Sequence, residues 1–379
     1  MVSQAPHQHQ RRRILIASDS FLPRWDGVSR FLSEIIPQLS SSYDITVLAP
    51  HFSGELKEIP GINTIRFHTY KWRVADIHPA KIRFATVKHL VRQSDIVWSQ
   101  TLGPIGAASM LYAKKYHKPL IAFIHSIEWD LFSKSLKRFQ NTVAWASKFL
   151  VRGLYNKCSL LMVPSENIAK FLEAQGINAK KEIVYLGTDV KRFAPTEDKR
   201  AAKKRIGIDP TKLVVGYVGR FGREKDLPTL YEAFRRIVKE RSDVILLLVG
   251  GTLDTPFENM ENVKVFGPTN NVVPYFQAMD IYVLPSLTET TSLTTMEAMS
   301  CGLPVVVTPV GYIANYVRHR VNGFLFPTQN VDRLEITLRN LIDDKALREK
   351  IGKAARKTIV SKYAWDKTAA KIAEILEKF

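Results

Sequence analysis

The chain has 379 residues, 45% of them hydrophobic and 24% charged, and its 55 lysines and arginines against 36 aspartates and glutamates give a net charge of +19. This composition is typical of a soluble globular protein of two domains, and no segment holds the roughly 18–20 uninterrupted apolar residues of a membrane-spanning helix. The two cysteines, Cys158 and Cys301, have no metal-ligand spacing, which argues against a disulfide scaffold and favours a reducing cytoplasm.

Short apolar runs alternate with helical patterns along almost the whole chain. Residues 1–12 are expected to form a disordered tail, because the apolar stretch behind them is too short for a signal peptide. We predict strands at Arg13–Ser18, Asp44–Ala49, Asn63–Phe67, Asp95–Ser99, Pro119–His125, Ser159–Val163, Glu182–Leu186, Leu213–Val218, Val244–Val249, Val263–Phe266, Ile281–Leu284 and Pro304–Thr308. Helical patterns fill the intervals, including Val28–Leu39, Ile105–Tyr116 and Ser165–Gln175.

The alternation of strand and helix predicts parallel sheets with helices on both faces. The continuous apolar runs VILLLV and IYVLP are typical of buried parallel strands. A polar stretch, Pro195–Arg205, is interpreted as the linker between two doubly wound α/β domains, 13–195 and 196–362. Ligands of such sheets bind beyond the carboxyl ends of the strands, so the site is expected in the cleft between the domains.

The most informative candidates for a functional site lie in the segment PSLTETTSLTTMEAMSCGLPVVVT, which begins at Pro285. Thr294-x-x-Glu297 reads as a capping box. If Glu289 and Glu297 lay on one helix they would stand about 12 Å apart along its axis, too far for a glycosidase pair but suitable for gripping two ends of one ligand. The N–H groups of Thr290–Leu293 would then form an anion site. The alternative is an ordinary solvent-facing acidic pair.

Within this segment PS-x-x-E-x₇-E-A-M-x-x-G-x-P-V-V resembles the signature of glycosyltransferase family 4, the retaining enzymes of the GT-B architecture. Further landmarks of that family follow the same order along the chain. They are FLPRWDG at 21–27, VPS at 163–165, GTD at 187–189, GRF with EK between 219 and 225, VG at 310–311 and NGF at 322–324. The resemblance implies the GT-B fold, with two Rossmann-like domains that face an interdomain cleft, and a last helix (363–379) that crosses back to the first domain.

The resemblance also implies roles for individual residues. Glu289 would bind hydroxyls of the transferred hexose and Glu297 the ribose, while Arg220 and Lys225 would neutralise the diphosphate, so that no metal or other cofactor is implied. His125 resembles the active-site histidine near the sugar, although a hydrogen-bonded strand-end histidine is the alternative reading. The remaining expected donor contacts are Gly27, Gly219, Thr290, Thr291, Ser292 and Leu293.

This chain also departs from the family pattern. Thr290, Thr291 and Ser292 replace a small-aromatic-glycine pattern, which leaves the donor open: frequency favours a UDP-sugar, UDP-glucose above all, over a GDP-sugar such as GDP-mannose, with UDP-galactose as a further alternative. Further departures stand at Tyr312, Ala314 and Asn315.

Residues 131–157 bear on the nature of the acceptor. They contain no aspartate or glutamate, and their lysines and arginines alternate with apolar side chains. This composition is typical of a helix that binds the surface of an anionic membrane, with a core-packed helix as the alternative. We therefore expect a lipid acceptor and a protein bound peripherally to the cytoplasmic face of the membrane. A soluble acceptor, an epimerase of similar fold and a nucleic-acid-binding protein are the rivals, the last supported by charge alone. The expected membrane and acceptor residues are Lys134, Lys137, Arg138, Trp145, Lys148 and Arg152.

Overall fold

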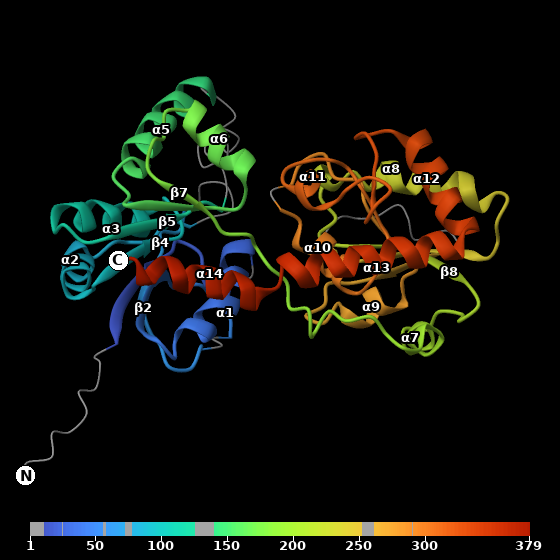
Figure 1. Cartoon of the computed structure of the whole chain (residues 1–379), viewed down its shortest axis with the longest axis horizontal. Coiled ribbons are helices and arrows are strands. Elements are labelled where there is room, and N and C mark those ends of the chain that lie inside the picture. Colours follow the sequence, from blue (N-terminus) through green and yellow to red (C-terminus); the bar gives the residue numbers. More distant parts are fainter. Residues whose placement is uncertain are drawn as a thin grey trace, which may run out of the picture. The chain divides into compact units, whose positions relative to one another are not determined.

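A computed structural model describes residues 11–24, 26–55, 58–72, 78–125, 140–251, 261–289 and 291–379, with side chains described from residue 148 onward in the fifth of these ranges (Figure 1). The chain forms two compact units. Unit 1 comprises the chain up to Tyr185 together with the C-terminal Thr368–Phe379, and unit 2 is Leu186–Lys367. The boundaries expected from the sequence stood at 195 and 363.

Unit 1 is built on a seven-stranded parallel sheet in the order β3-β2-β1-β4-β5-β6-β7. The central strands are buried along their whole length and are apolar except for Ser99 at the end of β4, in line with the buried parallel strands that were predicted. The strands are β1 (Arg12–Ala17), β2 (Tyr43–Pro50), β3 (Asn63–Phe67), β4 (Ile96–Ser99), β5 (Leu120–Phe123), β6 (Leu160–Val163) and β7 (Lys181–Ile183).

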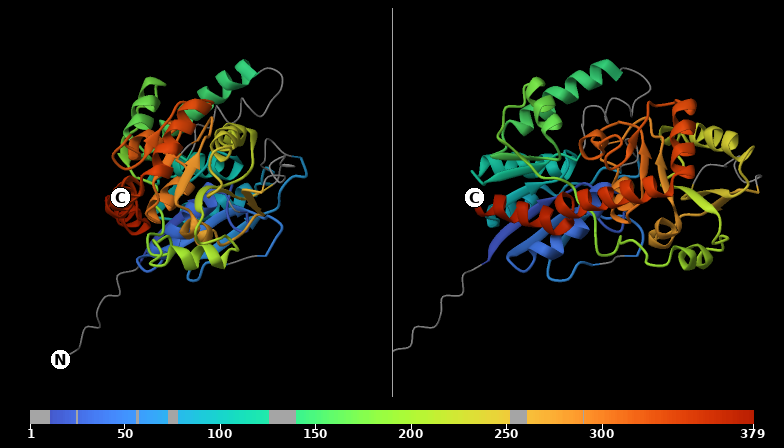
Figure 2. Two further views of the ribbon diagram at one scale, coloured as in Figure 1. Left: turned by 90° about the vertical axis from the view of Figure 1, so that its right-hand side faces the viewer. Right: turned by 45° about the vertical axis from the view of Figure 1, so that its right-hand side comes forward.

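Helices cover the sheet of unit 1, as the views in Figure 2 show. The first helix, α1, buries Phe31, Leu32, Ile35, Ile36 and Leu39, a stripe with the spacing of one helical face. The described helices of unit 1 are α1 (Gly27–Leu39), α2 (Phe84–Gln93), α3 (Pro104–Lys115), α5 (Gln140–Tyr155) and α6 (Glu166–Ala174), and most of α14 (Trp365–Glu377) also belongs to this unit.

Unit 2 has a six-stranded parallel sheet in the order β10-β9-β8-β11-β12-β13. Its strands are β8 (Leu213–Val218), β9 (Val244–Val249), β10 (Val263–Phe266), β11 (Ile281–Leu284), β12 (Val305–Val307) and β13 (Phe324–Leu325). Its described helices are α7 (Lys199–Arg205), α8 (Leu227–Val238), α9 (Val273–Ala278), α10 (Leu293–Ser300), α11 (Ile313–Tyr316), α12 (Val331–Asp343) and α13 (Lys345–Lys362). Two parallel, doubly wound sheets confirm the predicted fold class.

Three details differ from the sequence-based predictions. The stretch interpreted as a linker contains α7, which packs on α9 inside unit 2. This helix is held because Lys203 pairs with Asp280 at 2.7 Å and its ammonium also donates to the carbonyl of Lys212. Strand β1 begins at Arg12, within the expected tail. The two-residue strand β13 was not predicted.

Candidate functional site

The strand order of each sheet reverses once, between β1 and β4 in unit 1 and between β8 and β11 in unit 2. At such a switch point the loops that leave the two strands diverge and open a crevice at their carboxyl ends, where doubly wound proteins bind ligands. In unit 2 the loop after β8 begins at Gly219 and the loop after β11 at Pro285. The predicted donor residues of unit 2 lie on these two loops or on α10, which follows.

The loop after β8 presents a guanidinium group. Gly219 has φ 155°, a conformation that favours glycine, and the hydroxyl of Tyr217 donates to the carbonyl of Arg220 at 2.7 Å. The Arg220 guanidinium donates to the Glu224 carboxylate at 2.6 Å, and this pair is largely exposed. The main chain at Arg220 is therefore fixed, while its charged end is accessible to a ligand.

Lys225 links the two loops. Its ammonium lies 2.5 Å from a carboxylate oxygen of Glu289, and the hydroxyl of Ser286 donates to the same oxygen at 2.8 Å. A second link runs through the main chain, since the N–H of Leu287 donates to the carbonyl of Glu224 at 2.8 Å. The structure thus brings Arg220, Lys225 and Glu289 together at the switch point, with each cation paired to a carboxylate of the chain.

Helix α10 begins two residues earlier than the capping box predicted. Its N-cap is Ser292, at φ 55° and ψ 80°, and the Ser292 hydroxyl accepts from the N–H of Thr295. Thr294 is therefore inside the helix, and Glu297 is a buried helix residue with 1% exposure, so the predicted capping box is wrong. Glu289 precedes the helix, so the two glutamates do not share one helical face. Thr291 is buried and Leu293 opens the helix, while Thr290 lies outside the described residues.

The sequence reasoning assigned no role to the residues that hold this arrangement in place. Tyr217, Ser286 and Glu224 bond to Arg220, Glu289 or the loop backbone, as described above. Tyr316 contacts the turn before α10 through its hydroxyl, and the ring of Tyr312 packs against it at a centroid distance of 5.9 Å. A tyrosine in an apolar run reads as core packing, so the sequence carried no signal for this polar role. Of the other departures from the family pattern, Ala314 and Asn315 are exposed.

In unit 1 the loop after β1 is organised by Asp26. Its carboxylate caps α1 by accepting from the N–H groups of Val28 and Ser29, and it also accepts from Arg24. Burial alone would raise the pKa of Asp26, but hydrogen bonds from the Ser20 hydroxyl, the Ser29 N–H and Arg24, together with the charge of Arg24, lower it. Gly27 is the first residue of α1, and an added Cβ there would meet no atom within 4 Å, so the space beside it is open.

His125 follows β5 and lies beside the end of β4. Its Nε2 is 2.9 Å from the side-chain oxygen of Gln100, and its ring stacks on Phe123 with the edge of Phe31 nearby. Burial lowers the pKa of His125 to about 3, against the opposing charge of Asp26. The imidazole is therefore neutral near pH 7. Because the Gln100 oxygen accepts, Nε2 carries the proton and Nδ1 is the acceptor.

The switch point of unit 1 contains a buried carboxylate. Asp19 is 4% exposed and accepts from the N–H groups of Ile105 and Gly106 at 2.9 and 3.1 Å, and from the Thr101 hydroxyl at 2.8 Å. Burial raises the pKa of Asp19, and these hydrogen bonds oppose the rise. The start of α3 is thus already occupied by a carboxylate of the chain itself.

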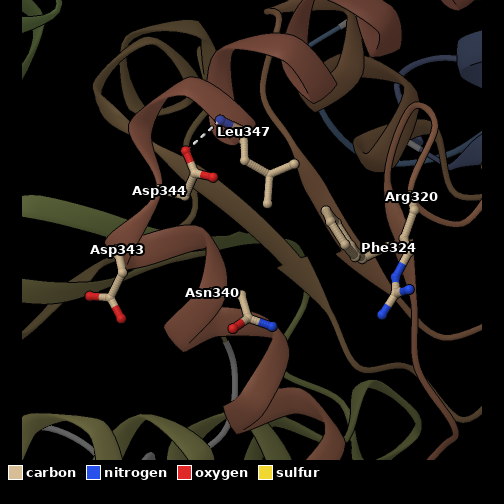
Figure 3. Close-up of a pocket in the computed structure, with 6 residues that line it drawn as sticks. All are labelled: Arg320, Phe324, Asn340, Asp343, Asp344 and Leu347. Atoms are coloured by element: carbon tan, nitrogen blue, oxygen red, sulfur yellow. Dashed lines mark hydrogen bonds between the residues drawn. The ribbon is translucent and has the colours of Figure 1, made fainter.

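A hollow of about 510 Å³ also lies in unit 2, and none of the predicted donor residues lines it (Figure 3). Near it, the Asp344 carboxylate accepts from the N–H of Leu347 and so caps α13. The residues that line it are Arg320, Phe324, Asn340, Asp343, Asp344 and Leu347. Among the described residues no cluster of three or more histidine, cysteine, aspartate or glutamate side chains could hold a metal.

The expected membrane residues are only partly covered. Lys134, Lys137 and Arg138 lie outside the described residues, as does the side chain of Trp145. At the described end of α5, Phe149 and Leu150 are 72% and 62% exposed between Lys148 and Arg152. In the described part of the chain, no helix is both long and apolar enough to cross a bilayer.

Two family models match the chain. Residues 25–192 match "Glycosyltransferase Family 4" and residues 198–358 match "Glycosyl transferases group 1". In shape the chain is similar to the solved structure of Anabaena Alr3699/HepE in complex with UDP, with a TM-score of 0.79 and 20% identity over 97% of this chain and all of that one. This neighbour has the GT-B fold.

Curated relatives match over nearly the full length. A GDP-mannose-dependent monoacylated alpha-(1-6)-phosphatidylinositol monomannoside mannosyltransferase of Corynebacterium glutamicum is 24% identical, over 97% of this chain and 98% of the relative. Sulfoquinovosyl transferase SQD2 of Arabidopsis thaliana is 30% identical, over 96% of this chain and 72% of the relative. With both halves matched by family models and a 30% identical relative along its length, the chain belongs to glycosyltransferase family 4 and is a glycosyltransferase of the GT-B fold.

Proposed function

We propose that the protein is a retaining glycosyltransferase that moves a hexose from a nucleotide-sugar to a hydroxyl group of a membrane lipid at the cytoplasmic face. The observation that carries the donor half of this proposal is the pair of cations, Arg220 and Lys225, at the switch point of unit 2 beside the start of α10. A helix start next to two cations favours the binding of a diphosphate.

A difference between the two units supports a diphosphate site in unit 2. In unit 1 the start of the corresponding helix, α3, is filled by the carboxylate of Asp19. In unit 2 the start of α10 is capped, among the described residues, by the neutral hydroxyl of Ser292, and the loop after β8 contributes Arg220 and Lys225. Like charges would repel a second anion from α3, whereas α10 and its two cations attract one.

Each group then has a stated task in the transfer. Arg220 and Lys225 stabilise the negative charge that develops on the departing diphosphate, the electrostatic contribution that usually dominates such catalysis. Glu289, once released by Lys225, accepts hydrogen bonds from sugar hydroxyls, and Glu297 does so from the ribose. His125, held neutral by burial, hydrogen-bonds to the sugar without adding charge. The departing phosphate takes the acceptor proton, so no separate enzymic base is needed.

The lipid acceptor is supported by the described end of α5. Phe149 and Leu150 expose apolar surface that a helix of a globular protein normally buries unless it binds a partner or a membrane. Lys148 and Arg152 flank them. Apolar and cationic side chains side by side are typical of helices that lie on anionic bilayers. The name of the mannosyltransferase relative includes a phosphatidylinositol derivative, which is an anionic lipid.

Two assays test the proposal. Thermal unfolding is followed with UDP, GDP, UDP-glucose, UDP-galactose and GDP-mannose, for the wild type and for Glu297→Gln. A ligand at a hundred times its Kd stabilises the fold by about 2.7 kcal/mol, and we expect this shift for one base and its reduction in the variant. If none of the five compounds shifts the melting temperature, the donor proposal is wrong.

The acceptor is tested by flotation with vesicles of phosphatidylcholine containing about a third phosphatidylglycerol, at low and high salt. The double variant Phe149→Ser/Leu150→Ser is expected to stay in solution. Leu111→Ser on α3, which removes a leucine that is 53% exposed, is expected to float with the wild type. Transfer of labelled sugar into the lipid phase completes the test. If the wild-type protein does not bind vesicles and glycosylates sugars in free solution, the soluble-acceptor alternative is correct.

A further inference from the structure

A buried tyrosine hydroxyl holds the turn that opens α10. Tyr316, the last residue of α11, is 1% exposed. Its hydroxyl donates to the carbonyl oxygen of Thr291 at 2.7 Å and lies 3.3 Å from the carbonyl oxygen of Ser292. The contact therefore fixes the main chain just before the helix rather than a neighbouring side chain.

The turn it holds is strained. Ser292 stands at φ 55° and ψ 80°, in the left-handed region that glycine adopts freely and that a residue with a Cβ adopts at a cost. Its capping hydrogen bond from the N–H of Thr295 is long, at 3.4 Å. Such a conformation persists only where the surroundings enforce it, and the hydroxyl of Tyr316 supplies that enforcement.

Tyr316 is itself anchored from several sides. Its ring packs against those of Tyr312 and Tyr363, at centroid distances of 5.9 and 5.8 Å. Its carbonyl oxygen accepts from the side-chain amide of Asn322 at 2.9 Å, and the same amide donates to the Thr358 hydroxyl. The hydroxyl is therefore presented by a rigid base, which is the requirement for a group that positions another.

We propose that Tyr316 is a positioning residue of the donor-phosphate site, acting through the carbonyls of Thr291 and Ser292. The clamp keeps the turn in the form in which the first N–H groups of α10, which have no partner within a helix, are available to the terminal phosphate. Ser292 together with Tyr316 does the work that a glycine does alone, at the position where the family pattern has glycine. The inference rests on the function proposed above.

The test compares nucleoside diphosphates with monophosphates by titration calorimetry, using UDP, UMP, GDP and GMP. Tyr316→Phe is expected to weaken diphosphate binding about tenfold and monophosphate binding less than threefold, because the clamp serves the terminal phosphate. Adding Ser292→Gly to Tyr316→Phe should bring the diphosphate Kd back to within about threefold of the wild type, since glycine needs no clamp. Tyr282→Phe is the matched control, because its buried hydroxyl bonds to the side chain of Thr294 and not to the turn.

The outcomes distinguish a failure of the proposed function from a failure of the role inferred for Tyr316. If the wild type binds neither UDP nor GDP, the proposed function fails and this inference fails with it. If the wild type binds one of them and folded Tyr316→Phe binds it equally well, only the inference is overturned. A loss that affects mono- and diphosphate alike, or that Ser292→Gly does not repair, shows general damage to the fold and also overturns it.

Discussion

The ion pair between Lys225 and Glu289 makes a prediction that runs against the usual effect of removing an active-site carboxylate. In the unliganded chain Glu289 already occupies the ammonium that the diphosphate needs, at 2.5 Å, and both side chains are mostly buried. Bound nucleotide must therefore displace Glu289 from Lys225. Glu289→Gln removes this competing charge and should tighten the binding of a nucleoside diphosphate that carries no sugar, while it abolishes most sugar transfer.

The magnitude follows from the strength of the bond that is lost. A hydrogen bond to a charged group contributes about 1.5–3 kcal/mol, and Glu289 keeps a second partner in Ser286, so we take about 1.4 kcal/mol as the part released. This corresponds to a roughly tenfold lower Kd for UDP or GDP. The control is Glu224→Gln, which frees Arg220 from an exposed pair at 2.6 Å and should change the Kd by less than about threefold.

The measurement is calorimetric titration of UDP and GDP into the wild type, Glu289→Gln, Glu224→Gln and Lys225→Ala, with transfer of labelled sugar measured in parallel. Lys225→Ala should weaken diphosphate binding, because it removes the cation itself. If Glu289→Gln weakens binding as much as Lys225→Ala does, Glu289 does not compete with the phosphate, and the reasoning from the ion pair is refuted.

Three further predictions concern stability. The pKa of His125 is about 3 in the folded chain and about 6.5 in the unfolded chain, so its contribution to the unfolding free energy is present above pH 6.5 and is lost as the pH falls. In urea titrations the wild type should lose about 2 kcal/mol relative to His125→Gln between pH 7 and pH 5. Equal losses in the two proteins would contradict this prediction. Asp19→Asn should destabilise unit 1 by about 2–4 kcal/mol in the same assay, since the amide replaces one acceptor of the start of α3 with a donor; an unchanged midpoint would count against this role. Gly187→Ala should lower the melting temperature, because its Cβ would lie 2.8 Å from the main-chain nitrogen of Trp365, whereas Gly153→Ala, with no atom within 4 Å, should not.

Most strands of the two sheets could be predicted from the sequence, because buried parallel strands are continuous apolar runs. Val244–Val249 and Leu213–Val218 coincide with β9 and β8, since an uninterrupted apolar run between polar turns has few other structures open to it. The two-residue β13 escaped because so short a strand has no periodicity. The polar α7 was taken for a linker because its stability comes from Lys203 pairing with Asp280, a contact far away in the sequence.

The candidate site was predictable in its members but not in its connections. The resemblance to the family singled out Arg220, Lys225 and Glu289, and the structure places them at one switch point. Their pairing in the unliganded chain depends on how two loops approach each other, which no local pattern encodes. The start of α10 was misplaced by two residues because the left-handed turn at Ser292 is imposed by a distant tyrosine rather than by the sequence of the turn.

The carboxylate of Asp19 at the start of α3 has a consequence for stoichiometry. Two sheets of the same type would offer two places for a nucleotide, one in each unit, and a chain of this kind could in principle titrate with two equivalents. One place is filled by the carboxylate of Asp19, which is part of the chain and cannot diffuse away. The chain should therefore take up one nucleotide, and the crevice of unit 1 is left for an uncharged hydroxyl.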